Sequence, residues 1–245
     1  LAATAVSMDF WNVRVEDVLV GQESSSYRVN GEIPVIPLES FSDEVASAME
    51  DVSQKMEEQD LYLNSSPGYW LRTFDRWADC EEFIGFPLNN PLEKSSLLET
   101  ANYFAIAQDA ETLNEESQRH CAVALQGNIK GELQHVTIDT GYLMGPIRIQ
   151  MTVSLYPEGS GMEPGTGGSW NGEAEFEITS GVTGEGIPYT LVVSETPESD
   201  YYNDFSSADA YFVLKNGLYT LDAVSPGRDS GADAKAALEE LLALF

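Results

Sequence analysis

The stretch "IRIQMTVSLY", residues 147–156, decides the fold. Ile149, Met151 and Val153 alternate along it with Gln150 and Thr152, and successive side chains of a β-strand point to opposite faces. The alternation therefore predicts a strand with one apolar and one polar face. Such a strand is typical of an antiparallel sheet that is buried on one side and faces water on the other.

Several other stretches have the same period of two. "EAEFEIT" (173–179) predicts a strand with Phe176 and Ile178 inward and its glutamates outward. "AYFVLKNGLYTLDAV" (210–224) predicts a hairpin, because Asn216-Gly217 suits a tight type I′ turn. Between these strands, the glycine-rich residues 157–173 are expected to form a mobile loop.

Apolar residues at helical spacing predict helices over 74–84 and 232–245, and a third helix after a Ser40 or Ser42 cap. In the first helix, Trp77, Cys80 and Phe83 form the apolar face, and the helix ends at Gly85. We expect an α+β fold in which helices cover one face of an antiparallel sheet. The predicted domains are a small N-terminal strand-helix unit over 1–66 and a main sheet domain over 67–245.

The charge is unusually negative, with 41 acidic residues against 12 basic residues and a formal net charge of -29. This charge repels phosphate backbones and anionic lipid headgroups, so nucleic acid is not an expected partner. Strong acidity suits a secreted or high-salt protein. The small apolar residues from Leu1 to Val6 resemble the outer end of a signal peptide or of a membrane helix. We therefore expect an extracytoplasmic protein that meets a membrane only through this segment or one upstream of it.

The two cysteines, Cys80 and Cys121, permit one disulfide, and two separate buried thiols are an equal alternative. No metal site is expected, because neither cysteine belongs to a CxxC pair and His120 and His135 lack ligand spacing. Adjacent residues on a strand point to opposite faces, so His120 and Cys121 are not expected to act as base and nucleophile. We predict no cofactor and assign no catalytic residue.

Candidate ligand-binding residues are Tyr69, Trp70, Trp170 and Glu175, because aromatic rings beside carboxylates hold sugars or peptides in many proteins. Packing at the edge of the core is the other interpretation of these aromatic residues. Glu173, Glu175 and Glu177 form a ladder with steps of about 7 Å on one strand face. The ladder suits a hard cation, the acid and base of glycoside hydrolysis, or a plain solvated surface.

Two segments resemble a known group of proteins. "YWLRTFDRWADCEEFIGFPLNNPLE" (69–93) resembles a segment with the pattern Trp-x-x-Ala-x-x-Phe-hydrophobic-Gly-hydrophobic-Pro-x-x-x-Pro-Leu. That segment occurs in extracellular regions of membrane-anchored, anti-sigma-factor-like or unknown-function proteins of Gram-positive gut bacteria. The last strands and "AKAALEELLALF" (234–245) are similar to the same group. Cys80 departs from the pattern, which has alanine there.

This resemblance implies a sensory or ligand-contacting domain joined by one membrane helix to a cytoplasmic regulator, with no catalytic residues to carry over. We therefore predict a non-enzymatic extracytoplasmic domain that binds an extracellular ligand or protein. Two alternatives remain. One is a secreted glycan hydrolase that uses carboxylates such as Glu175 and Glu177. The other is a structural surface or adhesion protein.

Overall fold

The computed structural model describes residues 13–21, 24–58, 68–103, 118–128, 130–171, 175–195, 205–227 and 231–245. The targeting-like segment from Leu1 to Val6 lies outside these residues. The strands are β1 (Val13–Leu19), β2 (Ser24–Gly31), β3 (Val35–Ile36), β4 (Gly68–Phe74), β5 (Glu99–Ala101), β6 (Cys121–Gly127), β7 (Leu133–Met144), β8 (Ile147–Pro157), β9 (Thr166–Asn171), β10 (Glu175–Val182), β11 (Pro188–Glu195), β12 (Phe205–Leu214) and β13 (Gly217–Pro226). The helices are α1 (Asp43–Glu58), α2 (Trp77–Ile84) and α3 (Gly231–Leu242), with short 3-10 turns at Leu38–Ser40 and Pro91–Lys94.

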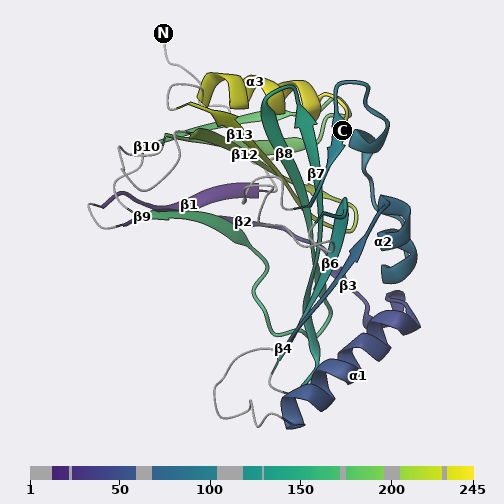
Figure 1. Ribbon diagram of the computed structural model, residues 1–245. Helices are drawn as coiled ribbons and strands as arrows, with labels where there is room; N and C mark the ends of the chain where they lie inside the picture. The colour runs from purple at the N-terminus through teal and green to yellow at the C-terminus, as the bar shows by residue number, and fades with distance from the viewer. Residues whose placement is uncertain are drawn as a thin grey trace.

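Within the described residues the strands form a large sheet and a small one (Figure 1). The large sheet has ten strands; eight run in the order β10-β11-β12-β13-β8-β7-β6-β4, while β5 pairs with β7 and β3 with β8. The small sheet has the order β1-β2-β9. All pairings are antiparallel except that of β3 with β8. The fold is thus mainly antiparallel sheet with three helices, which agrees with the coarse α+β expectation.

The prediction that one face of residues 147–156 is exposed to solvent is wrong for the second half of β8. Ile149, Met151 and Val153 are buried in the main core as expected. On the opposite face, however, Ser154 and Tyr156 are also buried, at 7% and 2% exposure. The small sheet covers this face, and its side chains form a second core with those of the large sheet: Val13, Tyr27, Val29, Ile33, Tyr156, Val192, Tyr211 and Leu218. Alternation along one strand cannot reveal a cover contributed by distant residues.

Part of the glycine-rich stretch is also different from the prediction. Residues 166–171 form β9, which pairs with β2 over Ser24–Val29. Gly167 allows this pairing, because a Cβ at that position would lie 2.3 Å from the carbonyl oxygen of Tyr27. The glycines here serve a close approach between backbones rather than a mobile loop.

The predicted helix over 74–84 starts three residues later. Residues 68–74 form β4, which pairs with β6 so that Phe74 lies opposite Cys121. The end of α2 is as predicted, since Gly85 adopts a left-handed conformation with φ of 101°. A Cβ on Gly85 would lie 2.8 Å from the backbone nitrogen of Ser42, so α2 ends directly against the start of α1. Ser42 caps α1 as expected, because its Oγ accepts a hydrogen bond from the Val45 N–H.

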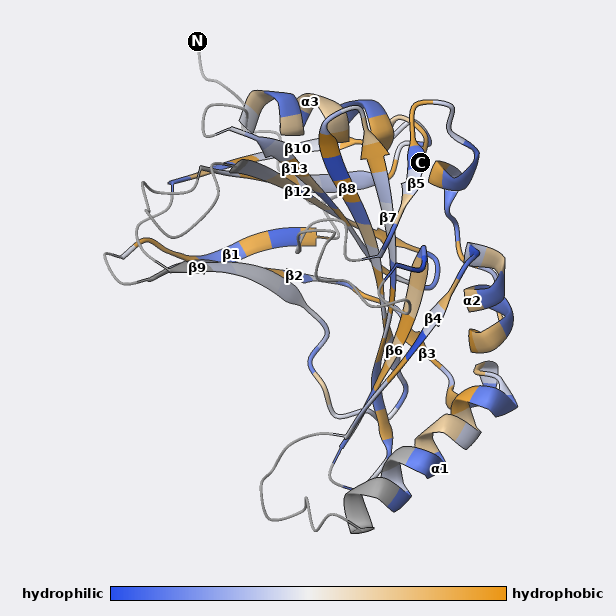
Figure 2. Ribbon diagram, viewed as in Figure 1, coloured by the Kyte–Doolittle hydropathy of each residue, from blue (hydrophilic) through white to orange (hydrophobic). Residues whose placement is uncertain are grey.

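Helix α3 packs against β11, β12 and β13, while α1 and α2 pack against β4 and β6. Hydrophilic and hydrophobic residues alternate along these helices, as Figure 2 shows. Phe245, just beyond α3, is fully buried against Phe212 and Tyr219. No helix in the described part of the chain combines the length and apolar character that crossing a bilayer requires.

The expected division into residues 1–66 and 67–245 has its boundary in a segment outside the described residues. The elements on the two sides of that boundary share one core, in which Ile36, Val45 and Met49 lie together with side chains of the large sheet. Residues 1–12 of the expected N-terminal unit also lie outside the described part of the chain.

Candidate functional site

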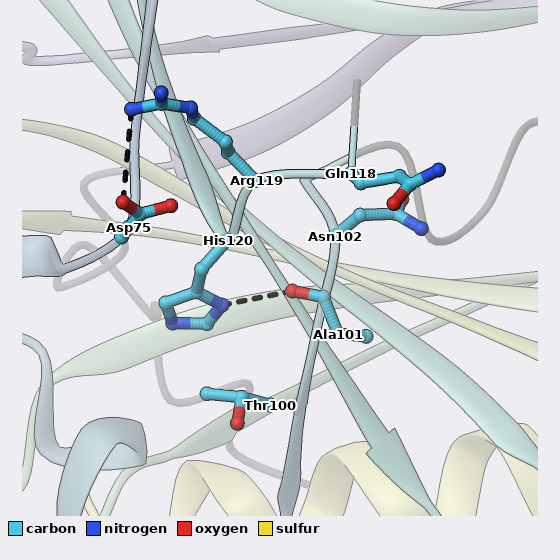
Figure 3. Close-up of a pocket in the computed structure, with 7 residues that line it drawn as sticks. All are labelled: Asp75, Thr100, Ala101, Asn102, Gln118, Arg119 and His120. Atoms are coloured by element: carbon cyan, nitrogen blue, oxygen red, sulfur yellow. Dashed lines mark hydrogen bonds and ion pairs between the residues drawn. The ribbon is translucent and has the colours of Figure 1, made fainter. Parts of the chain in front are cut away.

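A polar pocket of about 600 Å³ lies where the edge partner of β7 changes. Residues 133–140 of β7 pair with β6, and residues 141–143 pair with β5. The end of β5 and the start of β6 therefore meet beside β7, and Asp75 at the end of β4 lies close to them. Where one strand ends and another begins, backbone and side-chain groups are left without a partner in the sheet and can bind a ligand. The lining residues are Asp75, Thr100, Ala101, Asn102, Gln118, Arg119 and His120 (Figure 3).

Asn102 is the residue of this pocket whose hydrogen bonding indicates a ligand position. Its side-chain Oδ1 is buried and has no hydrogen-bond partner among the described residues. A buried polar atom without a partner costs about 1–3 kcal/mol, so such atoms are rare and require an explanation. Figure 3 shows Asn102 and Gln118 extending toward the same side of the pocket. A ligand with an N–H or O–H group would satisfy Asn102.

Arg119 and Asp75 provide the charges of the pocket. Their nearest nitrogen and oxygen atoms are 3.7 Å apart, and both side chains are well exposed. An exposed ion pair of this length contributes little to stability. The Arg119 guanidinium can therefore turn to a carbonyl or carboxylate of a ligand at small cost.

His120 lines the pocket, and its contacts favour the positively charged form of its ring. Its Nδ1 donates to the Ala101 carbonyl oxygen at 2.9 Å, and its Nε2 donates to Glu93 Oε1 at 2.7 Å. A carbonyl oxygen and a carboxylate both accept hydrogen bonds, so these two contacts favour the ring that carries a proton on each nitrogen. Burial alone would lower the His120 pKa, but contacts with Cys121, Glu93 and Ala101 raise it to about 10.

Glu93 is the counter-ion of this histidine. Besides the bond from His120, its Oε1 accepts a hydrogen bond from the Tyr142 hydroxyl at 2.8 Å. The hydrogen bond from His120 is the main cause that holds the Glu93 pKa below its usual range, while partial burial acts in the opposite direction. Asn90 donates to the Tyr142 hydroxyl at 2.8 Å and extends the network. The network fixes the position of the pocket wall.

The expectation that His120 and Cys121 do not act as base and nucleophile stays a prediction, but its premise that the two residues alternate along one strand does not hold. His120 precedes β6 and is not part of it, so strand alternation does not separate the two side chains. Thr140 Oγ1 links them, at 3.0 Å from His120 Nε2 and 3.5 Å from Cys121 Sγ. Cys80 of α2 belongs to the same core and influences the pKa of Cys121, and both cysteines are free and fully buried. Among the described residues no group of histidine, cysteine and acidic side chains has metal-binding geometry.

A second polar cluster lies between the two sheets. Asp209 on β12 and Asp222 on β13 are directly opposite each other and are hydrogen-bonded. Tyr27 of the small sheet donates to Asp209 Oδ2 at 3.0 Å, and its hydroxyl lies 2.6 Å from that of Tyr211. Burial raises the pKa of both aspartates, and the neighbouring Asp209 raises that of Asp222 further. Both carboxyl groups therefore favour the protonated form more than an exposed aspartate does.

The four predicted ligand-binding residues do not form one site. Tyr69 and Trp70 lie on β4, at one edge of the large sheet, and Glu175 lies on β10, at the other. Seven strand spacings separate these edges, on the order of 30 Å. Trp70 stacks on Phe83 with ring centroids 5.2 Å apart, which is a packing role, whereas Tyr69 is 66% exposed. Trp170 belongs to β9, and its side chain lies outside the described residues.

The glutamate ladder is also divided. Glu177 forms an ion pair with Lys235 of α3 at 2.6 Å, and Glu175 is exposed opposite Glu195. Glu173 lies outside the described residues. The ion pair occupies one of the two carboxylates on which the hydrolase alternative depends.

Most of the residues that line the pocket carry no recognisable signal in the sequence. Asn102, Gln118 and Arg119 belong to no motif, and only pairing of β7 with two different strands brings them together. The single available signal was the "RHC" sequence at 119–121, where a cation, a titratable ring and a thiol are adjacent. Comparisons of the chain with protein-family models, curated proteins and solved structures found no match.

Proposed function

We propose that this chain is a non-enzymatic binding or sensing domain that acts outside the cytoplasm, and that the pocket beside His120 holds its ligand. The observation that carries the proposal is the buried, unpartnered Oδ1 of Asn102 in that pocket. The net charge of -29 and the resemblance to membrane-anchored regulatory proteins support an extracytoplasmic role. In such a protein the domain would pass ligand occupancy to a regulator across the membrane.

The chemistry of the lining defines the class of ligand. Asn102 requires a donor, and Arg119 offers two or more N–H groups to an acceptor. The charges of Asp75 and Arg119 balance, as do those of Glu93 and His120. The pocket is thus locally neutral in a strongly acidic protein. A neutral or zwitterionic polar molecule, such as a saccharide or a short peptide, fits these features better than an anion or a metal ion.

Binding can be tested with defined probes. We would add neutral mono- and disaccharides and uncharged dipeptides, each at millimolar concentration, and follow the backbone amide resonances of the full chain by NMR. We expect saturable shifts at Asn102, Gln118 and Arg119 for at least one probe. Asn102→Ala should weaken that binding at least tenfold. Asn89→Ala is the matched control, because Asn89 is exposed and lies outside the pocket.

Two results would contradict the proposal. One is the absence of saturable shifts at the pocket for the whole panel. The other is binding that Asn102→Ala and Asn89→Ala affect equally. Specific turnover of a glycan, lost in Glu175→Gln without a change in melting temperature, would instead support the hydrolase alternative.

A further inference from the structure

The two cysteines come from distant parts of the fold and meet at one point. Cys80 lies in the middle of α2, and Cys121 is the first residue of β6. The pairing of Phe74 with Cys121 places the end of β4 beside the start of β6. Since α2 follows β4 after only Asp75 and Arg76, the helix packs over the start of β6, and its buried face carries Cys80 onto Cys121.

We infer that Cys80 and Cys121 form a thiol–disulfide site that fastens α2 to β6. Helix α2 packs on β6, and both cysteine side chains are 0% exposed within the same core, where each influences the pKa of the other. No other cysteine exists in the chain, so no competing pairing within the molecule is available.

The surroundings assign different roles to the two sulfurs. The Cys121 thiolate is favoured by the hydrogen bond from Cys80, by the charged His120 and by Thr140, which lower its pKa. Cys80 has the opposite setting, because its hydrogen bond with Cys121, its burial and the acidic side chains of Asp79 and Glu81 raise its pKa. Cys121 is therefore the attacking sulfur and Cys80 the resolving one.

The oxidant is a low-molecular-weight disulfide, RSSR. The Cys121 thiolate attacks one of its sulfurs, which forms a mixed disulfide and releases RS⁻. The Cys80 thiol then loses its proton to RS⁻, and its sulfur attacks the Cys121 sulfur and releases the second RS⁻. Two protein thiols are oxidised to one disulfide, and one RSSR is reduced to two thiols. Because both sulfurs are buried, exchange takes place during local opening of α2, which leaves His120 and Thr140 beside Cys121 in the sheet.

Equilibration of the full chain in glutathione buffers tests this inference, with trapping by iodoacetamide after acid quench and denaturation, and intact-mass analysis. We expect the folded chain to become two hydrogens lighter and to lose both alkylation sites. The folded chain should also be half oxidised in a glutathione buffer that is at least tenfold more reducing than the buffer in which the chain in urea is half oxidised. The melting temperature should rise by roughly 5–15 °C on oxidation.

Single variants provide the controls. Cys80→Ala and Cys121→Ala should each give a mixed disulfide with glutathione at most and no change of melting temperature with the glutathione ratio. Equal or easier reduction of the folded chain than of the chain in urea would overturn the inference, since the native fold would then oppose the bond. Two alkylated thiols in the most oxidising buffer would do the same. These outcomes are independent of ligand binding in the pocket.

Discussion

Asp209 and Asp222 face each other across the β12–β13 ladder and are hydrogen-bonded to one another, although like charges in directly opposed positions of a sheet destabilise it. Tyr27 from the small sheet donates to Asp209, and Tyr211 lies beside it. Asp139 on β7 adds negative charge from the same face, where Thr152 and Gln150 bind it. The contact between the two sheets thus includes two buried carboxyl groups whose pKa values are raised.

Asp222→Asn should stabilise the protein at high pH. The folded pKa of the pair lies above the unfolded value near 3.9, so the folded state binds more protons above about pH 4 and stability falls as pH rises through the folded pKa. The asparagine side chain stays neutral at every pH, and its amide N–H can donate a hydrogen bond to Asp209. Urea unfolding should show a gain of about 1–3 kcal/mol at pH 8 and little change near pH 4.

Asp51→Asn is the control for this variant, because it removes the same charge from an exposed position of α1. It should change stability by less than about 0.5 kcal/mol at either pH. A similar gain from both variants would mean that overall repulsion, and not the pair, governs the pH dependence.

Glu93→Gln should destabilise the protein by about 1–3 kcal/mol at neutral pH, because it leaves the His120 charge without its counter-ion. The raised His120 pKa contributes stability that is complete below about 6.5 and is lost as pH rises toward about 10. The lowered Glu93 pKa contributes stability above its unfolded value that is lost on acidification. NMR titration of the His120 ring should show a pKa well above 6.5 in the native protein and a lower one in Glu93→Gln. An unchanged pKa in the variant would refute the ion pair.

Trp70→Ala and Tyr69→Ala should separate a packing residue from a surface residue on one strand. Trp70 stacks on Phe83 with an interplanar angle of 8°, so its loss should cost about 1–3 kcal/mol in urea unfolding. Tyr69 is 66% exposed, and its loss should cost less than about 0.5 kcal/mol. Equal costs would show that the stacking does not stabilise α2 on β4.

Phe245→Ala should cost about 3–5 kcal/mol, because the ring fills the core between Phe212 and Tyr219 at the end of α3. Leu244→Ala is its neighbour control; Leu244 is 38% exposed and should cost less than about 1 kcal/mol. Thermal unfolding monitored by circular dichroism measures both. A small loss for Phe245→Ala would indicate that the core closes without this residue.

Local sequence patterns determined much of the secondary structure. Alternation predicted the apolar face of β8, and Gly85 predicted the end of α2. The β12–β13 hairpin also forms, but the predicted type I′ turn at Asn216-Gly217 is wrong: Leu214 pairs with Gly217, so the turn is Lys215-Asn216, and neither Asn216 nor Gly217 has a positive φ. These features depend on residues within a few positions of each other, where side-chain period and backbone conformation are set by neighbours in the chain.

The tertiary structure alone decided which faces are covered and which side chains meet. The small sheet, built from residues before 32 and after 165, covers the face of β8 that local alternation predicts to be wet. The pocket depends on a change of partner along β7, and the Cys80–Cys121 and Asp209–Asp222 pairs depend on strand register. No local period encodes these contacts, because they arise from the burial of distant surfaces against one another.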